Sequence, residues 1–338
     1  MMLMSIILCV VALISCINSC FALAIPRASC NSSAQRPVIE IHHPEELFNF
    51  TKANDDLISS SSDDFFVNIN PPKIAFTKRP NVCNDCVCGA GRKTRIVGGT
   101  IANIAEFPWM VGMTKQGQFH CGGSLITRLH VLTAAHCLEG FDKRYFEVYM
   151  GDDRVAKRSN NAIRRRVKSW TIHKDFNSYN LNNDIAIIEL DRAVSLNGHI
   201  KTACLPENRA IDYTGSLAIA IGWGRTTEGG DISSQLRKVK VPVLSDEECD
   251  EAGYQKTRRT ENMFCAGYLE GLRDACSGDS GGPLLVNGPH NHLEIIGITS
   301  FGRGCARPRY PGVYTKVTNY LGWLSDELND ECICPSSI

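Results

Sequence analysis

Three residues that lie far apart in the sequence could together perform nucleophilic catalysis. They are His136, Asp184 and Ser280. A serine hydroxyl is a weak nucleophile near neutral pH, so it needs a neighbouring imidazole to accept its proton. The imidazole in turn needs a buried carboxylate that fixes its tautomer and stabilises its protonated form. The three residue types are therefore those of a nucleophilic relay.

The segments around these residues support this interpretation only when they are taken together. They are Leu132–Cys137, Asn182–Ala186 and Gly278–Pro283. The glycines beside Ser280 leave room for backbone N–H groups to converge on an oxyanion. Alone, a histidine beside a cysteine is often structural, an aspartate before an apolar run is usually a turn residue, and Gly-Gly-Pro makes turns. In this order within one predicted β domain, they indicate a catalytic site.

The elements that must position these residues are predicted to be strands. From Ile96 onward, short apolar runs alternate with Gly, Pro, Asn and Asp, which is typical of a β-sandwich or β-barrel. Examples of such runs are Glu147–Met150, Ile185–Leu190, Leu217–Ile221 and Ile295–Ile298. Apolar residues at helical spacing between Val317 and Leu328 predict a closing helix.

The composition bounds the compartment and the partners. The chain has 338 residues, 43% of them apolar, and a formal net charge of zero, so nothing global points to nucleic acid or to a membrane surface. Sixteen cysteines indicate an oxidising compartment.

Residues 1–24 are predicted to be a signal peptide, because an apolar run ends in the small-residue pattern Ala22-Leu23-Ala24. The alternative is a membrane anchor, since no Lys or Arg precedes the run and its length approaches that of a bilayer span. Either way, we expect the rest of the chain to be secreted or extracellular, and Asn31 and Asn49 to be glycosylation sites.

Residues 25–95 are predicted to be a poorly ordered pro-segment that ends in a cysteine-containing junction at 83–95. Cys83 and Cys86 form a Cys-x-x-Cys pair, which suggests zinc, redox chemistry or disulfides. Disulfides are favoured, because no second pair with zinc-finger spacing lies nearby in the sequence and the compartment is oxidising.

From Ile96 to about Leu328 the chain resembles the trypsin-type serine proteases of the chymotrypsin fold. The matching motifs are Arg95–Gly99, Thr133–Cys137, Asp184–Ala186, Gly222–Gly224, Gly278–Pro283 and Pro311–Tyr314. The resemblance implies an all-β fold in which residues 96–338 form two six-stranded antiparallel β-barrels and a C-terminal helix, with the active site between the barrels. By this resemblance, the mechanism of the family would make His136 the general base and then the general acid, Asp184 its orienting partner and Ser280 the nucleophile.

The same resemblance assigns further roles in the site. The N–H groups of Gly278 and Ser280 would form the oxyanion hole, and Ser300 would lie beside the carboxylate of Asp184. Asp274, six positions before Ser280, would form the floor of a pocket for substrate Arg or Lys, because its carboxylate would pair with their charge.

The walls of that pocket would be kept open by Gly302 and Gly312. Ala275 stands where many trypsins carry serine, and the loss of that hydroxyl predicts a preference for Arg over Lys.

Activation is expected to follow cleavage between Arg95 and Ile96. In the family, the new ammonium group pairs with the aspartate before the nucleophile, here Asp279, and this pair orders the site. The activator would be an Arg-specific protease or the enzyme itself.

Family positions also imply a set of disulfides. These are Cys121–Cys137, Cys249–Cys265, Cys276–Cys305, and Cys204 with Cys83, Cys86 or Cys88. The other two junction cysteines could pair with Cys332 and Cys334, which leaves Cys30 odd; similar junction and tail cysteines occur in some arthropod zymogens. The pro-segment would then stay tethered after activation.

No metal and no cofactor are expected. The stretch from Asp152 to Lys168 corresponds to a calcium loop of some trypsins but is basic here, and calcium needs several oxygen ligands. The basic run Arg164–Lys168 is either a polyanion exosite or, as charge runs usually are, a solvated face.

The expected partners are protein or peptide substrates and serpin- or Kunitz-type inhibitors. The rival interpretations are a catalytically dead homologue that only binds, and a digestive trypsin. The complete set His136, Asp184 and Ser280 argues against the first, and the long tethered pro-segment argues against the second.

Overall fold

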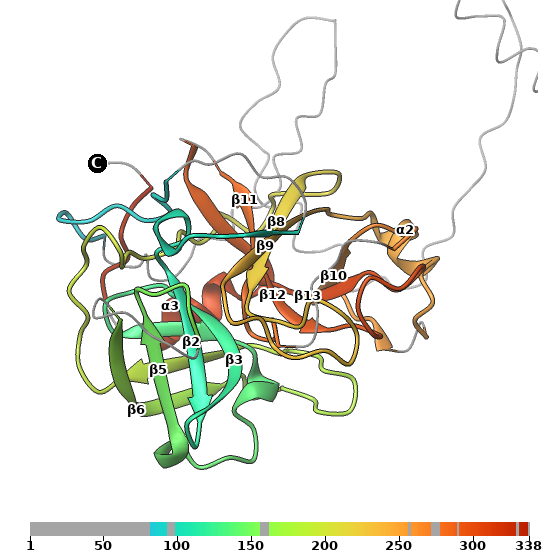
Figure 1. Ribbon diagram of the computed structural model, residues 1–338. Helices are drawn as coiled ribbons and strands as arrows, with labels where there is room; N and C mark the ends of the chain where they lie inside the picture. The colour runs from blue at the N-terminus through green and yellow to red at the C-terminus, as the bar shows by residue number, and fades with distance from the viewer. Residues whose placement is uncertain are drawn as a thin grey trace, which may run out of the picture. The chain divides into compact units, whose positions relative to one another are not determined.

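The computed structural model describes residues 82–92, 99–155, 162–255, 258–271, 278–288, 291–328 and 331–336, all within a unit that spans residues 72–338 (Figure 1). Several sites expected from the sequence lie outside the described residues. These are the signal peptide, Asn31, Asn49, Cys30, Arg95, Ile96, Asp274, Ala275 and Cys276.

Six antiparallel strands close into a barrel in the first half of the domain, in the order β2-β3-β4-β7-β6-β5. Their bounds are β2 Met110–Lys115, β3 Gln118–Leu125, β4 His130–Thr133, β5 Phe146–Met150, β6 Ile163–Ile172 and β7 Ala186–Leu190. β2 and β3 form a two-residue hairpin at Gln116 (φ 52°) and Gly117 (φ 80°), where positive φ matches the twist of the strands. Apolar side chains such as Val111, Val131 and Ile188 fill the interior.

The second half forms a seven-stranded sheet in the order β1-β9-β8-β11-β12-β13-β10. Its strands are β1 Thr100–Ile101, β8 Leu217–Gly222, β9 Arg237–Pro242, β10 Met263–Ala266, β11 Pro283–Asn287, β12 Leu293–Phe301 and β13 Gly312–Lys316. A bridge between Val243 and Ala266 joins the end of β9 to β10. The six strands β8 to β13 therefore curl into the second expected barrel, and β1 is a seventh strand added at the edge of β9. The predicted all-β fold is confirmed.

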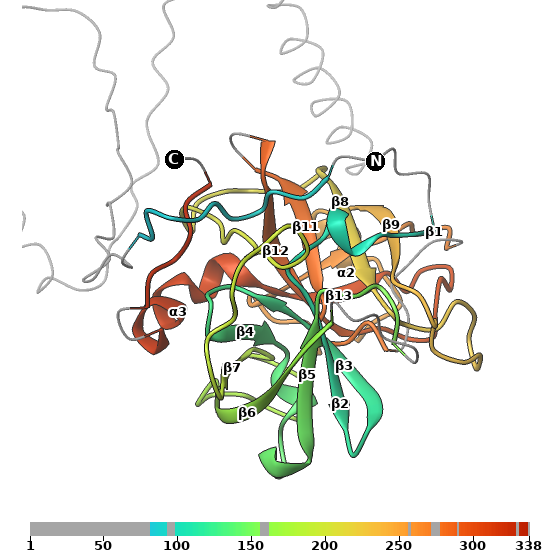
Figure 2. The same ribbon diagram turned by 60° about the vertical axis from the view of Figure 1, so that its left-hand side comes forward.

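The helices are short and lie at the ends of strands. They are η2 Ile104–Glu106, η3 Ala135–Cys137, η4 Lys143–Tyr145, α2 Asp246–Asp250, η7 Val317–Tyr320 and α3 Leu321–Glu327. η7 and α3, the second drawn in red in Figure 2, together confirm the predicted closing helix, although its first turn is a 3-10 helix. Leu321, Leu324 and Leu328 belong to the hydrophobic cluster that contains the interior residues of the first barrel. Within the described ranges, no helix is long and apolar enough to cross a bilayer.

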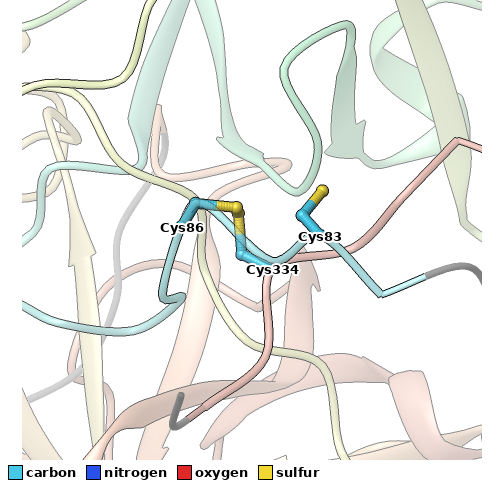
Figure 3. Close-up of side chains that lie close together, drawn as sticks. All are labelled: Cys83, Cys86 and Cys334. Atoms are coloured by element: carbon cyan, nitrogen blue, oxygen red, sulfur yellow. A yellow bond between two sulfur atoms is a disulfide. The ribbon is translucent and has the colours of Figure 1, made fainter.

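Disulfides join the junction segment to the C-terminal tail and to the domain. The bonds are Cys83–Cys332, Cys86–Cys334 and Cys88–Cys204. Figure 3 shows Cys86 bonded to Cys334, with Cys83 beside them. Val82 forms a parallel bridge with Ile333, so the two segments lie side by side.

Two further disulfides join pairs of described residues within the domain. They are Cys121–Cys137 and Cys249–Cys265. Cys305 is also disulfide-bonded, and its expected partner Cys276 lies outside the described residues.

A buried ion pair between Lys238 and Glu106 joins β9 to the segment that follows β1. The side chains of Lys238 and Glu106 are 2% and 8% exposed, so both charges are removed from water. Glu106 also accepts a hydrogen bond from the N–H of Asn103 at 2.9 Å, which completes a capping box around η2. The pair thus fixes the segment around η2 against β9.

Loss of one member of this pair should leave the other as an uncompensated buried charge. Glu106→Gln keeps an acceptor for Asn103 but removes the negative charge, and we expect the free energy of unfolding to fall by about 3–5 kcal/mol. Lys238→Met should cost a similar amount, and the double variant should lose much less than the sum. Chemical denaturation of the four proteins gives the coupling energy. Additive losses would contradict the prediction.

Candidate active site

The first barrel brings His136 and Asp184 together. β4 ends at Thr133, shortly before His136 in η3, and β7 begins at Ala186, shortly after Asp184. The two strands are antiparallel neighbours, with Thr133 opposite Ala186. The end of one strand therefore lies beside the start of the other, and the imidazole meets the carboxylate.

The Asp184 carboxylate is fully buried and accepts hydrogen bonds from two residues. One oxygen accepts from the backbone N–H of His136 at 2.9 Å. The other lies 2.7 Å from His136 Nδ1 and also accepts from the hydroxyl of Ser300. A carboxylate held in this way requires the proton of His136 to sit on Nδ1, which leaves Nε2 free to accept a proton.

The main chain around Asp184 is held from the second half of the domain. Thr315 donates its hydroxyl to the carbonyl of Asp184 at 2.8 Å. Tyr320 donates to the side chain of Asn183 at 2.8 Å, and burial together with the nearby Asp184 charge raises the pKa of Tyr320. Asn183 adopts φ 58°, a conformation that asparagine tolerates better than most residues. These partners came from no sequence motif, because they lie more than 130 residues away in the chain.

The segment that carries Ser280 is bonded to both barrels. The carbonyl of Ser280 accepts a hydrogen bond from the N–H of Gly122 in β3 at 2.8 Å. The N–H of Gly281 donates to the carbonyl of Thr299 in β12 at 2.9 Å. Gly281 has φ 76°, and a Cβ there would lie 2.3 Å from Thr133 Oγ1. Glycine is therefore required at this position, and Ser280 is fixed relative to the strand that precedes His136.

The structure brings the three predicted residues to one region but does not join all of them. Within the described part of the chain, there is no hydrogen bond between Ser280 Oγ and His136 Nε2. Hydrogen bonds of this type are often long or poorly aligned without substrate, so their geometry in a free enzyme does not exclude a catalytic pair. Gly278 has φ 101°, a conformation that strongly favours glycine.

The carboxylate of Asp279 lies against two glycines at the end of β8, of which Gly222 is its last residue and Gly224 follows it. It accepts from the N–H of Gly224 at 2.7 Å. A Cβ at Gly222 would lie 2.1 Å from one carboxylate oxygen, and one at Gly224 would lie 2.4 Å from the other. The motif Gly222-Trp223-Gly224 is therefore the cradle of Asp279.

His120 is a second histidine near the site that the sequence analysis did not single out. Its Nε2 lies 2.8 Å from the carbonyl of Cys137, directly after His136. Burial lowers the pKa of His120, and edge-on contacts with Phe141 and Phe146 hold the ring. A neutral imidazole protonated at Nε2 fits this position. The available signal was the Phe-His-Cys sequence of β3, directly before Gly122 and Gly123.

The two segments expected to wall the substrate pocket are tied together by Tyr254. Its hydroxyl donates to the carbonyl of Pro311 at 2.8 Å and accepts from the N–H of Arg303 at 3.2 Å. These bonds lie next to Gly312 and Gly302, respectively. A Cβ at Gly302 would meet no atom closer than 3.9 Å, so this wall borders open space.

Two groups of side chains in the described residues come close enough to share a metal ion. They are Cys83, Cys86 and Cys334, and Cys121, His136 and Cys137. Every cysteine in both groups is disulfide-bonded and so offers no thiolate. These groups therefore do not fit a metal.

The basic run lies on β6, where side chains alternate between faces. Arg164, Arg166 and Lys168 are exposed, and Arg165 is only partly exposed. Lys168 is ion-paired with Glu189 at 2.6 Å, and Glu147 lies opposite Arg166 in the β5–β6 pairing. The exposed face therefore has mixed charge.

Comparisons with known proteins agree with this geometry. The sequence profile described as "Trypsin" matches residues 96–324, more than half of the chain. "Proclotting enzyme" of Tachypleus tridentatus is 37% identical over 279 residues, which cover 76% of this chain and 74% of that protein.

Two other relatives are similar at the same level. "Clotting factor G beta subunit" of Tachypleus tridentatus is 36% identical over 248 residues, 69% of this chain and 79% of that protein. "Serine protease filzig" of Drosophila melanogaster is 36% identical over 297 residues, and the match covers 84% of this chain but only 17% of filzig. The chain belongs to the trypsin family of serine proteases, with relatives among arthropod enzymes.

Proposed function

We propose that the protein is a secreted serine endopeptidase that hydrolyses peptide bonds after Arg, and after Lys less readily. The observation that carries the proposal is the buried Asp184 carboxylate, hydrogen-bonded to both His136 and Ser300 beside the segment of Ser280. His136 takes the proton of Ser280 as Oγ attacks the peptide carbonyl, and the N–H groups of Gly278 and Ser280 stabilise the oxyanion. His136 then protonates the leaving amine, and water hydrolyses the acyl-enzyme.

Substrate selection rests on Asp274 at the floor of the pocket, with Gly302 and Gly312 in its walls. An unpaired carboxylate in a poorly solvated pocket is unfavourable, so a substrate guanidinium or ammonium is preferred over a neutral side chain. Ala275 leaves the floor without a serine hydroxyl. The bidentate geometry of Arg then has the advantage over the single charge of Lys.

Activation by cleavage at Arg95–Ile96 is supported by the position of the segment downstream. Gly99, three residues after Ile96, accepts a hydrogen bond from Arg237 at 2.6 Å. Arg237 lies opposite Gly222 in the pairing of β8 with β9, and Gly222 contacts the side chain of Asp279. Three extended residues span about 10 Å, and we propose that this length lets a new N-terminus at Ile96 reach the Asp279 carboxylate.

The remaining expectations complete the proposal. Residues 1–24 would be the signal peptide, 25–95 the pro-segment and 96–338 the protease domain, with serpin- or Kunitz-type proteins as inhibitors. The bond Cys88–Cys204 supports a pro-segment that stays tethered after the cut. The mixed charge around Arg164–Lys168 does not favour the polyanion site.

Labelling tests the nucleophile. After activation by an Arg-specific protease, a fluorophosphonate probe should modify Ser280, and mass spectrometry should locate it there. Ser280→Ala should abolish labelling and lower kcat on the order of 10⁶-fold, and Asp184→Asn should lower it by about 10⁴-fold because the tautomer is wrong. A folded, activated chain that neither reacts nor hydrolyses peptides would favour the dead homologue.

Matched peptide substrates test the pocket. We expect higher kcat/KM for Arg than for Lys before the cut, and Ala275→Ser should narrow this ratio. Asp274→Ser should lower kcat/KM for Arg roughly 10²- to 10³-fold, since the charged partner is lost. Equal rates for Arg and Lys, or a Lys preference, would refute the role given to Ala275.

The activation switch is tested at Arg95. Arg95→Gln should yield a folded, secreted protein that an Arg-specific protease cannot activate, because no ammonium forms at Ile96. Arg209→Gln, a matched change at an exposed position far along the chain, should remain activatable. Full peptidase activity of the Arg95→Gln protein would rule out the switch.

A further inference from the structure

Two exposed arginines flank a row of three aromatic rings, which begins with Phe301, the residue after Ser300. The Tyr254 ring packs edge-on against Phe301 at 5.7 Å and against Tyr310 at 5.4 Å. The guanidinium of Arg258 lies 6.0 Å from the Phe301 ring, and that of Arg303 lies 4.9 Å from the Tyr310 ring. The row therefore carries a cation at each end.

Hydrogen bonds hold both guanidinium groups in place. Arg258 donates to the carbonyl of Tyr179 at 3.1 Å, and Arg303 donates to the hydroxyl of Tyr310 at 2.9 Å. An arginine that is already held by an aromatic face and a hydrogen bond loses little further freedom when it binds a carboxylate.

Neither arginine has a carboxylate partner among the described residues. Their neighbours differ in this respect. Arg259 pairs with Asp246 and Asp250 at 2.6 Å, and Arg307 pairs with Glu228. The two held arginines thus retain N–H donors that no internal acid occupies.

The two arginines lie beside the end of β12, the strand that carries Ser300. β12 pairs with β11 only as far as Ile298, and Phe301 pairs with Val313 of β13. The other edge of residues 300–302 is therefore unpaired by any described strand and can accept an extended peptide. Arg258 also contacts Tyr179, which is 84% exposed and belongs to the loop that leads into Asp184.

We infer that Arg258 and Arg303 select substrates with an acidic residue among the three that precede the cleaved Arg. This inference rests on the proposed function, which places the Arg before the cut in the pocket walled by Gly302 and Gly312. A peptide leaving that pocket along Phe301 advances about 3.3 Å per residue, so its next three side chains pass the two guanidinium groups. Opposite charges attract there and like charges repel.

The same arginines disfavour the protein's own activation sequence. Arg95 is preceded by Arg92-Lys93-Thr94, so two positive charges lie within the three upstream positions. Cleavage of one copy by another would bring these charges against Arg258 and Arg303. The activator is therefore a different Arg-specific protease, one without this pair of cations.

Peptides that share Arg before the cut test the selection. At each of the three upstream positions we compare Asp with Asn, which has the same shape without the charge. At one position at least, kcat/KM should be about tenfold higher for Asp, and the ratio should shrink with added salt. Arg258→Ala and Arg303→Ala should each lower the ratio about threefold, which is the size of an exposed ion pair.

The control is Arg209→Ala, an exposed arginine outside this row, which should leave the Asp/Asn ratio unchanged. Equal rates for Asp and Asn in the wild-type enzyme would overturn the inference, as would a ratio that survives the double alanine variant. If peptides with Ala before the cut are cleaved as well as those with Arg, the proposed function itself fails. Cleavage restricted to Arg with no Asp preference defeats only this inference.

Cleavage of the zymogen tests the second consequence. The substrate is the full chain with Ser280→Ala, which cannot cut itself. Active wild-type enzyme should cut it slowly at Arg95, and Arg258→Glu/Arg303→Glu enzyme should cut it at least about tenfold faster. Adding Arg92→Asp/Lys93→Asp to the substrate should accelerate the wild-type enzyme instead. Equal rates in all of these pairings would show that the charges do not control self-activation.

Discussion

The buried carboxylate of Asp184 is the constraint on which the candidate active site depends. A charge that is fully removed from water is tolerated only when donors surround it. Here the donors come from both halves of the domain, because His136 follows β4 of the first barrel and Ser300 lies in β12 of the second sheet. Thr315 of β13 adds a bond to the main chain. Satisfying this one charge therefore aligns the two halves and orients the imidazole together.

The sequence predicted the elements that depend on short-range patterns along the chain. Alternating apolar runs predicted the strands, and the spacing between Val317 and Leu328 predicted the closing helix, since both follow from short-range periodicity. The supports of Asp184 were out of reach, because Asn183 and Tyr320 meet only after the fold brings them together. The family resemblance likewise left three possible partners for Cys204, because connectivity cannot be deduced from spacing, and the structure selects Cys88.

Buried polar contacts also explain how the segment from Thr100 to Glu106 is held in place. β1 adds to the edge of β9, Glu106 forms its ion pair with Lys238, and η2 is capped by Asn103. A lone two-residue strand would not hold its place. A buried ion pair adds little net stability relative to apolar residues, but it penalises every arrangement that separates its charges. The ion pair therefore selects one arrangement of this segment against the second barrel.

The disulfides and the hydrogen bond between Arg237 and Gly99 lie on opposite sides of the proposed cut. Upstream, Cys88–Cys204 holds the chain seven residues before Arg95, and the bonds to Cys332 and Cys334 hold it further back. Downstream, the carbonyl of Gly99 is bound to Arg237, whose strand partner contacts Asp279. Both anchors would survive a cut at Arg95, because neither of them includes the bond that is cut. A switch of the proposed kind needs no release of the pro-segment, because the cut would leave Cys88 bonded to Cys204.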